Sequence, residues 1–121
     1  MMTTEHSLAL LAIVLVMGCS HADASVVPGG DVARGKQDVR AMGCGACHTI
    51  DGLTGAHGEV GPPLTTIGRR SIIAGELPNT PDNMIRWLEN PQAVEPNTAM
   101  PNLGIGPQSA RDIAAYLSTL R

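Results

Sequence analysis

The 121-residue sequence predicts a small all-α domain, and three observations lead to that prediction. Apolar side chains recur at helical spacing, proline and capping residues stand where helices begin, and no convincing alternation of strand type occurs. Once the leader described below is removed, about a hundred residues remain, which suits a single domain. We expect three to four helices in it.

The first expected helix covers residues 31–42, because Asp31 can cap its start and Gly43 can end it. A second helix begins at Thr80-Pro81-Asp82, where a capping hydroxyl precedes a proline at the first helical position and an acid in the first turn. It should run to about residue 90, where Pro91 stops it.

The last expected helix opens at Pro107, with Gly106 as its cap. Five apolar residues then follow at helical spacing: Ala110, Ile113, Ala114, Leu117 and Leu120. Between the first two helices, residues 52–78 form a long segment rich in glycine and proline. A loop this long is uncommon in a compact domain, but it is reasonable if it wraps around a bound group.

The run Cys44-Gly45-Ala46-Cys47-His48 indicates which group is bound. It has the C-x-x-C-H pattern by which a c-type haem is attached. The two thiols can add across two vinyl groups of one porphyrin, and the two residues between them let one turn of chain present both sulfurs. The imidazole of His48 can then lie beneath the iron, for which it is a good ligand. We therefore expect one covalently bound haem c, held by Cys44, Cys47 and His48.

Three other interpretations of this run fit less well. A dithiol redox site usually needs a βαβ context, which the pattern lacks. A structural zinc site needs four ligands, whereas the chain has three cysteines, and Cys19 has another explanation. A structural disulfide between Cys44 and Cys47 would not require His48.

An iron with one histidine ligand needs a second axial ligand or an open site. The candidates are Met42, Met84, Met100 and His57. Met42 lies too near Cys44 to reach the other face of the ring. Met84 fits the apolar face of its helix, and His57 lies in a glycine-rich loop close in sequence to the proximal side.

Met100 is the favoured second ligand. Proline and glycine on both sides fix a loop, Asn97-Thr98-Ala99-Met100-Pro101-Asn102-Leu103-Gly104, and Met100 lies 52 residues after His48, enough chain to pass around the ring edge. Its alternative role is a plain buried apolar residue. Ligation of the metal by His48 and Met100 leaves no open coordination site and raises the reduction potential, which suits electron transfer.

Residues 8–17 are an unbroken apolar run, too short to span a bilayer and typical of a signal-peptide core. The run ends in Val16-Met17-Gly18-Cys19, which resembles the lipobox of bacterial lipoproteins. The resemblance implies a lipoprotein-type signal peptide (residues 1–18), a lipid on Cys19 and a lipid-anchored tether (residues 19–30). An ordinary cleaved signal is the alternative. Either would place the domain, residues 31–121, outside the cytoplasm, on the periplasmic side of a bacterial membrane.

The amino-acid composition also favours a bound haem. Aromatic residues make up 2% of the chain, with no phenylalanine, so few large side chains are present for a core. Small domains usually need an additional constraint, and a porphyrin would supply the missing apolar mass. We therefore expect the chain without haem to be largely unfolded. The net charge of −3 and the single lysine, Lys36, exclude the basic block typical of nucleic-acid binding.

The chain resembles class I c-type cytochromes, and more narrowly the cytochrome c domain of caa3-type oxidase subunit II. The matching stretches are Gly35-Lys36-Gln37, Gly43-Cys44-Gly45-Ala46-Cys47-His48, Gly61-Pro62-Pro63-Leu64, Ile67-Gly68-Arg69-Arg70, Ala74-Gly75-Glu76-Leu77-Pro78-Asn79-Thr80-Pro81, Trp87-Leu88-Glu89-Asn90-Pro91-Gln92, Met100-Pro101-Asn102-Leu103-Gly104 and Asp112-Ile113-Ala114-Ala115-Tyr116-Leu117. The resemblance implies a cytochrome c fold wrapped around one haem. It also places Gly35 against Tyr116 where the first and last helices cross, with the missing side chain making room for the ring.

The resemblance implies roles for three further residues. The Pro62 carbonyl would accept the second N–H of His48, which orients the imidazole and increases its basicity; the alternative is a rigid turn residue. Arg70 would lie near the haem propionates, or else be a solvated surface residue. Trp87 would pack on the haem edge with its N–H toward a propionate, or else be part of the core.

The function that follows is the carriage of single electrons in a bacterial respiratory chain, without catalysis and without a small-molecule substrate. The resemblance implies a membrane-bound terminal oxidase as the partner, met through a small, weak interface at an exposed haem edge. Three alternatives remain. The chain could be the electron-transfer subunit of a periplasmic dehydrogenase or reductase complex, a haem sensor or enzyme with a labile Met100, or a structural lipoprotein whose haem only stabilises the fold.

Overall fold

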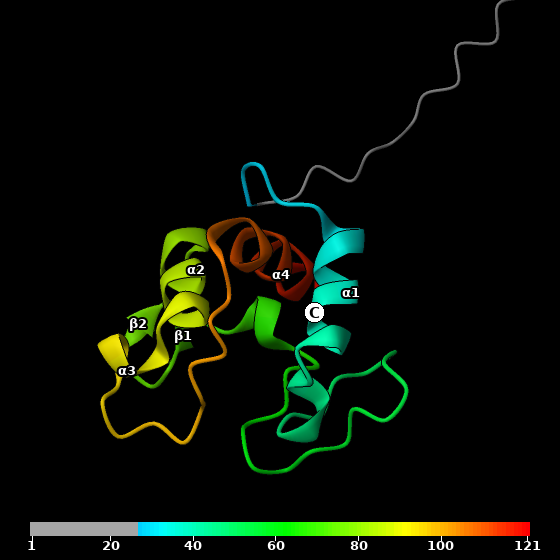
Figure 1. The fold of residues 1–121 in the computed structure, drawn as a ribbon, viewed down its shortest axis with the longest axis horizontal. Helices are drawn as coiled ribbons and strands as arrows, with labels where there is room; N and C mark the ends of the chain where they lie inside the picture. The colour runs from blue at the N-terminus through cyan, green and yellow to red at the C-terminus, as the bar shows by residue number, and fades with distance from the viewer. Residues whose placement is uncertain (1–26) are drawn as a thin grey trace, which may run out of the picture.

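Four α-helices form the framework of residues 27–121, the part of the chain that the computed structural model describes. They are α1 (Val32–Ala41), α2 (Pro81–Glu89), α3 (Pro91–Val94) and α4 (Pro107–Thr119). Figure 1 shows α4 between α1 on one side and α2 on the other. The predicted signal peptide, the predicted lipid site at Cys19 and residues 19–26 of the predicted tether lie outside the described residues.

The predicted helix boundaries are confirmed where capping residues set them. The Asp31 side chain accepts a hydrogen bond from the backbone N–H of Arg34 at the start of α1, and Gly43, with φ +73°, follows its end. The Thr80 hydroxyl caps α2 by accepting from the Asn83 N–H. Gly106 stands at the N-cap of α4, directly before Pro107.

A short helix and a two-stranded hairpin interrupt the segment that the sequence predicted to be a loop, residues 52–78. A 3₁₀ helix, η2 (Ile67–Arg69), precedes an antiparallel hairpin of β1 (Ile72–Ile73) and β2 (Leu77–Pro78). Left-handed backbone at Ala74 and Gly75 forms the turn between the strands. Each strand has only two residues, too few for an alternating pattern to be visible in the sequence.

The helix α3 was also not predicted. Pro91 ends α2 as expected, but it is then the first residue of the new helix, which the Asn90 side chain caps by accepting from the Ala93 N–H. A proline that cannot continue one helix is well suited to the first position of the next.

The helices α1 and α4 cross in close contact at Gly35. A Cβ on Gly35 would overlap the backbone carbonyl of Asp112 and lie 2.9 Å from the Cβ of Tyr116. The predicted pairing of Gly35 with Tyr116 is therefore confirmed. The absent side chain, however, makes room for the backbone of α4 rather than for the tyrosine ring.

The core surrounds α4, whose residues from Asp112 to Leu117 are all buried. The predicted apolar face of this helix is confirmed, with Ala110 and Ile113 completely inaccessible. From α2, Met84 and Leu88 are buried and Ile85 is half-buried, so the expected position of Met84 on the apolar face of that helix is also confirmed.

Residues 27–30 pack against α4, although the sequence analysis placed them in the tether. Val27 is 2% exposed and belongs to the core, and the Gln108 side chain donates to the Gly29 carbonyl. A Cβ on Gly30 would lie 2.7 Å from that of Ala115. Residues 27–30 therefore pack with the domain that the sequence predicts to begin at residue 31.

Within residues 27–121, no helix has both the length and the apolar character needed to span a bilayer.

Candidate haem site

The C-x-x-C-H run forms one tight turn directly after α1. The left-handed Gly43 redirects the chain into a 3₁₀ helix, η1 (Cys44–Ala46). The backbone N–H groups of Cys47 and His48 then both donate to the Cys44 carbonyl, at 3.2 and 3.0 Å. This turn brings two thiols and an imidazole together within five residues, as attachment to a single porphyrin requires.

Both thiols of the turn are free and half-buried. Burial raises the pKa of the Cys44 thiol, and the neighbouring Cys47 adds to the effect. The site thus favours a neutral sulfur at Cys44. A thioether formed with a vinyl group is also neutral, so the buried position suits the attached state. The disulfide alternative for this pair is absent from the structure.

His48 is held through one ring nitrogen. Its Nδ1 lies 2.7 Å from the Pro62 carbonyl oxygen, which can only accept, so Nδ1 carries the hydrogen and donates. The hydrogen bond that the resemblance implied is present. In the neutral ring, Nε2 then has a free lone pair, the electron pair with which an imidazole binds a metal.

Two glycines close the space around this turn. A Cβ on Gly61 would overlap Cε1 of the His48 ring and approach its Nδ1 to 2.7 Å. A Cβ on Gly58 would overlap the backbone of Ala46. Their N–H groups donate to the Cys47 carbonyl (2.7 Å, Gly61) and to the Gly45 carbonyl (3.0 Å, Gly58). Gly58 and Gly61 therefore lie directly against the attachment turn, and the imidazole of His48 packs on the backbone at Gly61.

Arg70 lies beside the same loop. Its Nη2 donates to the Pro63 carbonyl at 2.7 Å, one peptide beyond the carbonyl that holds His48. The side chain is thus partly engaged by the backbone, which the sequence did not predict. A contact between Arg70 and a propionate stays a prediction.

The predicted second ligand, Met100, is half-buried and packs against the core. Its backbone is fixed on both sides: the Met100 N–H donates to the Thr98 hydroxyl at 3.1 Å, and Gln92 donates to the Met100 carbonyl at 2.8 Å. Trp87, on α2, is likewise half-buried against the core. Packing suits the core role of Trp87, and its predicted contact with the haem edge stays untested.

The other methionines and His57 occupy positions that suit roles other than ligation. Met84 is 6% exposed in the core, as its helical position predicted. Met42 caps the end of α1 and packs against the core. His57 is exposed and forms an isolated β-bridge with Thr49.

The two predicted ligand segments belong to opposite sides of the molecule in the view of Figure 1. The segment from η1 through the green loop lies below α1, and the yellow-to-orange loop between α3 and α4 lies below α2. Among residues 27–121, no three or more His, Cys, Asp or Glu side chains gather in a way that could hold a metal ion directly. The described cysteine pair therefore lacks the further ligands that a structural zinc site requires.

Comparison with known proteins defines the class to which this fold and turn belong. Residues 32–121 match the sequence profile of the cytochrome c family, and the chain belongs to that family. Cytochrome c oxidase subunit 2 of Alkalihalophilus pseudofirmus is 32% identical over 88 residues, which cover 73% of this chain. Cytochrome c2 of Rhodopila globiformis is 32% identical over 106 residues, covering 78% of this chain and 97% of that protein. The chain spans only 24% of the length of the oxidase subunit.

The predicted resemblance to class I c-type cytochromes, the cytochrome c fold and the haem c cofactor are thereby confirmed. The residues present fit that cofactor: two free thiols at the right spacing, an imidazole with Nε2 available, and a glycine cradle that side chains would fill.

Three residues of the site escaped the sequence analysis. Gly61 was part of a quoted match but was given no role; the Gly61-Pro62 pair indicates a turn, and the contact with the His48 ring is visible only in the structure. Gln92 and Asn79 form side-chain hydrogen bonds to backbone carbonyls 8 and 12 residues away in sequence. Local sequence patterns do not predict hydrogen bonds of this kind.

Proposed function

We propose that this chain carries single electrons in a bacterial respiratory chain, with His48 and Met100 as the two axial ligands of one haem c. The observation that carries the proposal is the fixed imidazole: His48 donates from Nδ1 to Pro62, contacts Gly61, and directly follows two free thiols. When bound, haem supplies an iron that alternates between the ferric and ferrous states.

The residues of the site would bind and orient the haem and would not themselves take part in a chemical reaction during electron transfer. Cys44 and Cys47 would fix the ring covalently to the turn after α1. The hydrogen bond to Pro62 orients His48 and makes its Nε2 a stronger electron donor, which favours the ferric state. No proton transfer and no substrate is needed at this site.

Met100 would complete the coordination from the loop between α3 and α4. Hydrogen bonds to Thr98 and Gln92 fix its backbone, so little chain ordering is needed for its sulfur to bind. Two ligands retained in both oxidation states keep the change of geometry small, which suits rapid electron exchange. They also leave no position for oxygen or another small ligand.

We propose a membrane-bound terminal oxidase as the electron acceptor. The support is the similarity to an oxidase subunit 2, which covers 73% of this chain at 32% identity. The match to cytochrome c2 along 97% of that protein supports a haem domain of similar extent. With a lipid on Cys19, the domain would operate at the outer surface of a bacterial membrane and close to such an oxidase.

A pair of methionine variants tests the ligand assignment. We expect Met100→Leu to keep its covalent haem, to lose the methionine–iron charge-transfer band of the ferric protein, and to bind carbon monoxide in the ferrous state. Met42→Leu is the matched control, because Met42 is also half-buried against the core, and it should behave as the wild type. A wild-type ferrous protein that binds carbon monoxide readily at neutral pH would instead favour a sensor or enzyme with a labile Met100.

Oxidation by a terminal oxidase tests the partner. Ferrous wild-type protein, mixed with oxidase-containing membranes from the source bacterium, should be oxidised in a cyanide-sensitive reaction. Unchanged ferrous absorbance in the presence of active membranes would contradict the proposed acceptor but not the haem site.

A further inference from the structure

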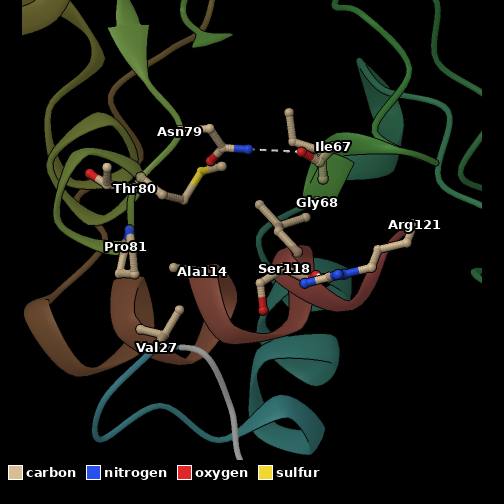
Figure 2. Close-up of a pocket in the computed structure, with 11 residues that line it drawn as sticks. Val27, Ile67, Gly68, Asn79, Thr80, Pro81, Ala114, Ser118 and Arg121 are labelled. Atoms are coloured by element: carbon tan, nitrogen blue, oxygen red, sulfur yellow. Dashed lines mark hydrogen bonds between the residues drawn. The ribbon is translucent and has the colours of Figure 1, made fainter. Parts of the chain in front are cut away.

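Asn79 lies in the Leu77-Pro78-Asn79-Thr80-Pro81 run, part of a stretch that resembles the cytochrome c domain, and the resemblance implies no role for it. Thr80 and Pro81 start α2, which leaves Asn79 unexplained. Asn79 is half-buried and lines a pocket of about 210 Å³ between α2, η2 and the end of α4 (Figure 2).

The Asn79 amide connects both ends of one turn. Its Nδ2 donates to the carbonyl of Ile67, the contact drawn in Figure 2, and to the carbonyl of Arg70, both at 2.9 Å. The Arg70 N–H also donates to the Ile67 carbonyl at 3.1 Å, and the Asn79 N–H donates to Ser71. Both hydrogens of the amide are therefore used to fix the backbone that carries the Arg70 side chain.

The same turn is fixed from the opposite side by α4. The Gly68 N–H donates to the Leu120 carbonyl at 2.8 Å, and a Cβ on Gly68 would lie 2.5 Å from the Ser118 carbonyl oxygen. Asn79 and the end of α4 thus hold η2 between them, so the backbone of Arg70 has a defined position.

From this backbone, the Arg70 side chain reaches the loop that holds His48. Arg70 Nη2 donates to the Pro63 carbonyl, and His48 Nδ1 donates to the carbonyl of the preceding residue, Pro62, each at 2.7 Å. Contacts thus run without a break from Asn79 through Arg70 and two successive peptides to the imidazole.

We propose that Asn79 and Arg70 are positioning residues that set the orientation of His48 and thereby the reduction potential. The inference rests on the proposed function, in which His48 binds the iron. A well-aligned hydrogen bond at Nδ1 strengthens the imidazole as a donor and favours the ferric state. Loosening the Pro62–Pro63 loop therefore raises the potential.

Asn79→Ala in the haem-containing protein tests the proposal, because this change removes both amide donors without altering any charge. At a fixed applied potential, we expect the ferrous-to-ferric ratio to rise about threefold, which is about 30 mV at 59 mV per tenfold for one electron. We also expect hydrogen exchange of the His48 Nδ1–H, followed by NMR of the ferrous protein, to become about tenfold faster. Asn83→Ala is the matched control, since Asn83 Nδ2 donates at the same length to Pro78, outside this set of contacts.

Arg70→Met, which removes both charge and donor, separates positioning from a direct effect on the propionates. Faster exchange of the His48 proton together with a changed potential supports positioning. A changed potential with unchanged exchange, or wild-type values for Asn79→Ala in both measurements, overturns the proposal. If the wild-type protein itself shows no His48 bound to covalently attached haem, the proposed function fails, and that result is distinct from either variant outcome.

Discussion

At the scale of single residues, the site depends on how His48 is restrained. One ring nitrogen donates to the Pro62 carbonyl, and the ring lies so close to Gly61 that no side chain fits there. Fixing the imidazole before the metal is bound removes rotamer freedom that ligation would otherwise have to restrict.

Gly61→Ala should therefore disturb the imidazole directly. A methyl group would overlap the ring, so His48 must move away from Pro62, and we expect a loss of about 1–3 kcal/mol in the stability of the haem-containing protein. The reduction potential should rise, because the hydrogen bond at Nδ1 weakens. Urea denaturation and potentiometry measure the two effects. Gly106→Ala, which places its methyl in open space, is the control, and equal behaviour of the two variants would show that the His48 contact does not matter.

The residues of the site that belong to one short sequence motif were predicted from the sequence. Cys44, Cys47 and His48 lie within five consecutive residues, and the family resemblance implied the contact with Pro62. The role of Asn79 was not predictable, because it depends on carbonyls that only the folded chain brings near it. Spacing along the chain carries no information about such contacts.

At the scale of elements, a buried carboxylate joins α1 to α4. Asp112 accepts hydrogen bonds from the Asp31 N–H (2.8 Å), from Arg34 Nε (3.0 Å) and from Gln108 Nε2 (2.9 Å), while its side chain is 3% exposed. Burial raises the pKa of this carboxyl, but the hydrogen bonds and the positive charge of Arg34 outweigh it. The pKa of Asp112 therefore lies below its ordinary value of 3.8.

This lowered pKa gives the crossing of α1 and α4 a defined pH dependence. Because the folded protein binds the Asp112 proton more weakly than the unfolded chain, the stabilisation is fully present above pH 3.8 and is lost as the pH falls through the folded-state value. We expect Asp112→Asn to lower the free energy of unfolding by about 1–3 kcal/mol at neutral pH, because Arg34 then faces an amide that can donate.

Denaturation of the haem-containing protein at several pH values measures this effect. The difference between wild type and Asp112→Asn should shrink on acidification below pH 3.8, whereas the exposed Asp51→Asn should stay close to wild type throughout. A difference that does not change with pH would contradict a role for the Asp112 charge.

Helices whose ends are marked by local residues were predicted accurately, whereas elements that depend on contacts between distant residues were not. Caps and prolines are local, so the bounds of α1, α2 and α4 agree with the sequence patterns to within about a residue. The elements η2, β1 and β2 are two or three residues long and depend on contacts such as Gly68 with Leu120. The sequence therefore predicted a loop where the structure has a short turn and a hairpin.

At the scale of the whole molecule, the core is built almost entirely from aliphatic side chains. Tyr116 is the only aromatic residue among the buried hydrophobic residues of the described chain, and α4 contributes several alanines. Further apolar residues are only half-buried at its edge: Leu64, Leu77, Trp87 and Met100. A porphyrin among them would remove more apolar surface from water, at about 25 cal/mol per Å².

The chain without haem should therefore be largely unfolded. In Cys44→Ser/Cys47→Ser, the covalent attachment is lost, and a domain of this size usually needs such a constraint in addition to its core. Far-UV circular dichroism should show most of the helical signal missing relative to the haem-containing protein. Native-like helix content in the variant would mean that the polypeptide folds independently of its cofactor.

One haem, attached through Cys44 and Cys47 and ligated by His48 and Met100, should exchange a single electron. An optical potentiometric titration of the purified protein tests this expectation. We expect one transition with the slope of a one-electron couple, and a methionine–iron band that is present in the ferric form and disappears on reduction. A protein without the haem spectrum, or a ferric spectrum without that band, would contradict it.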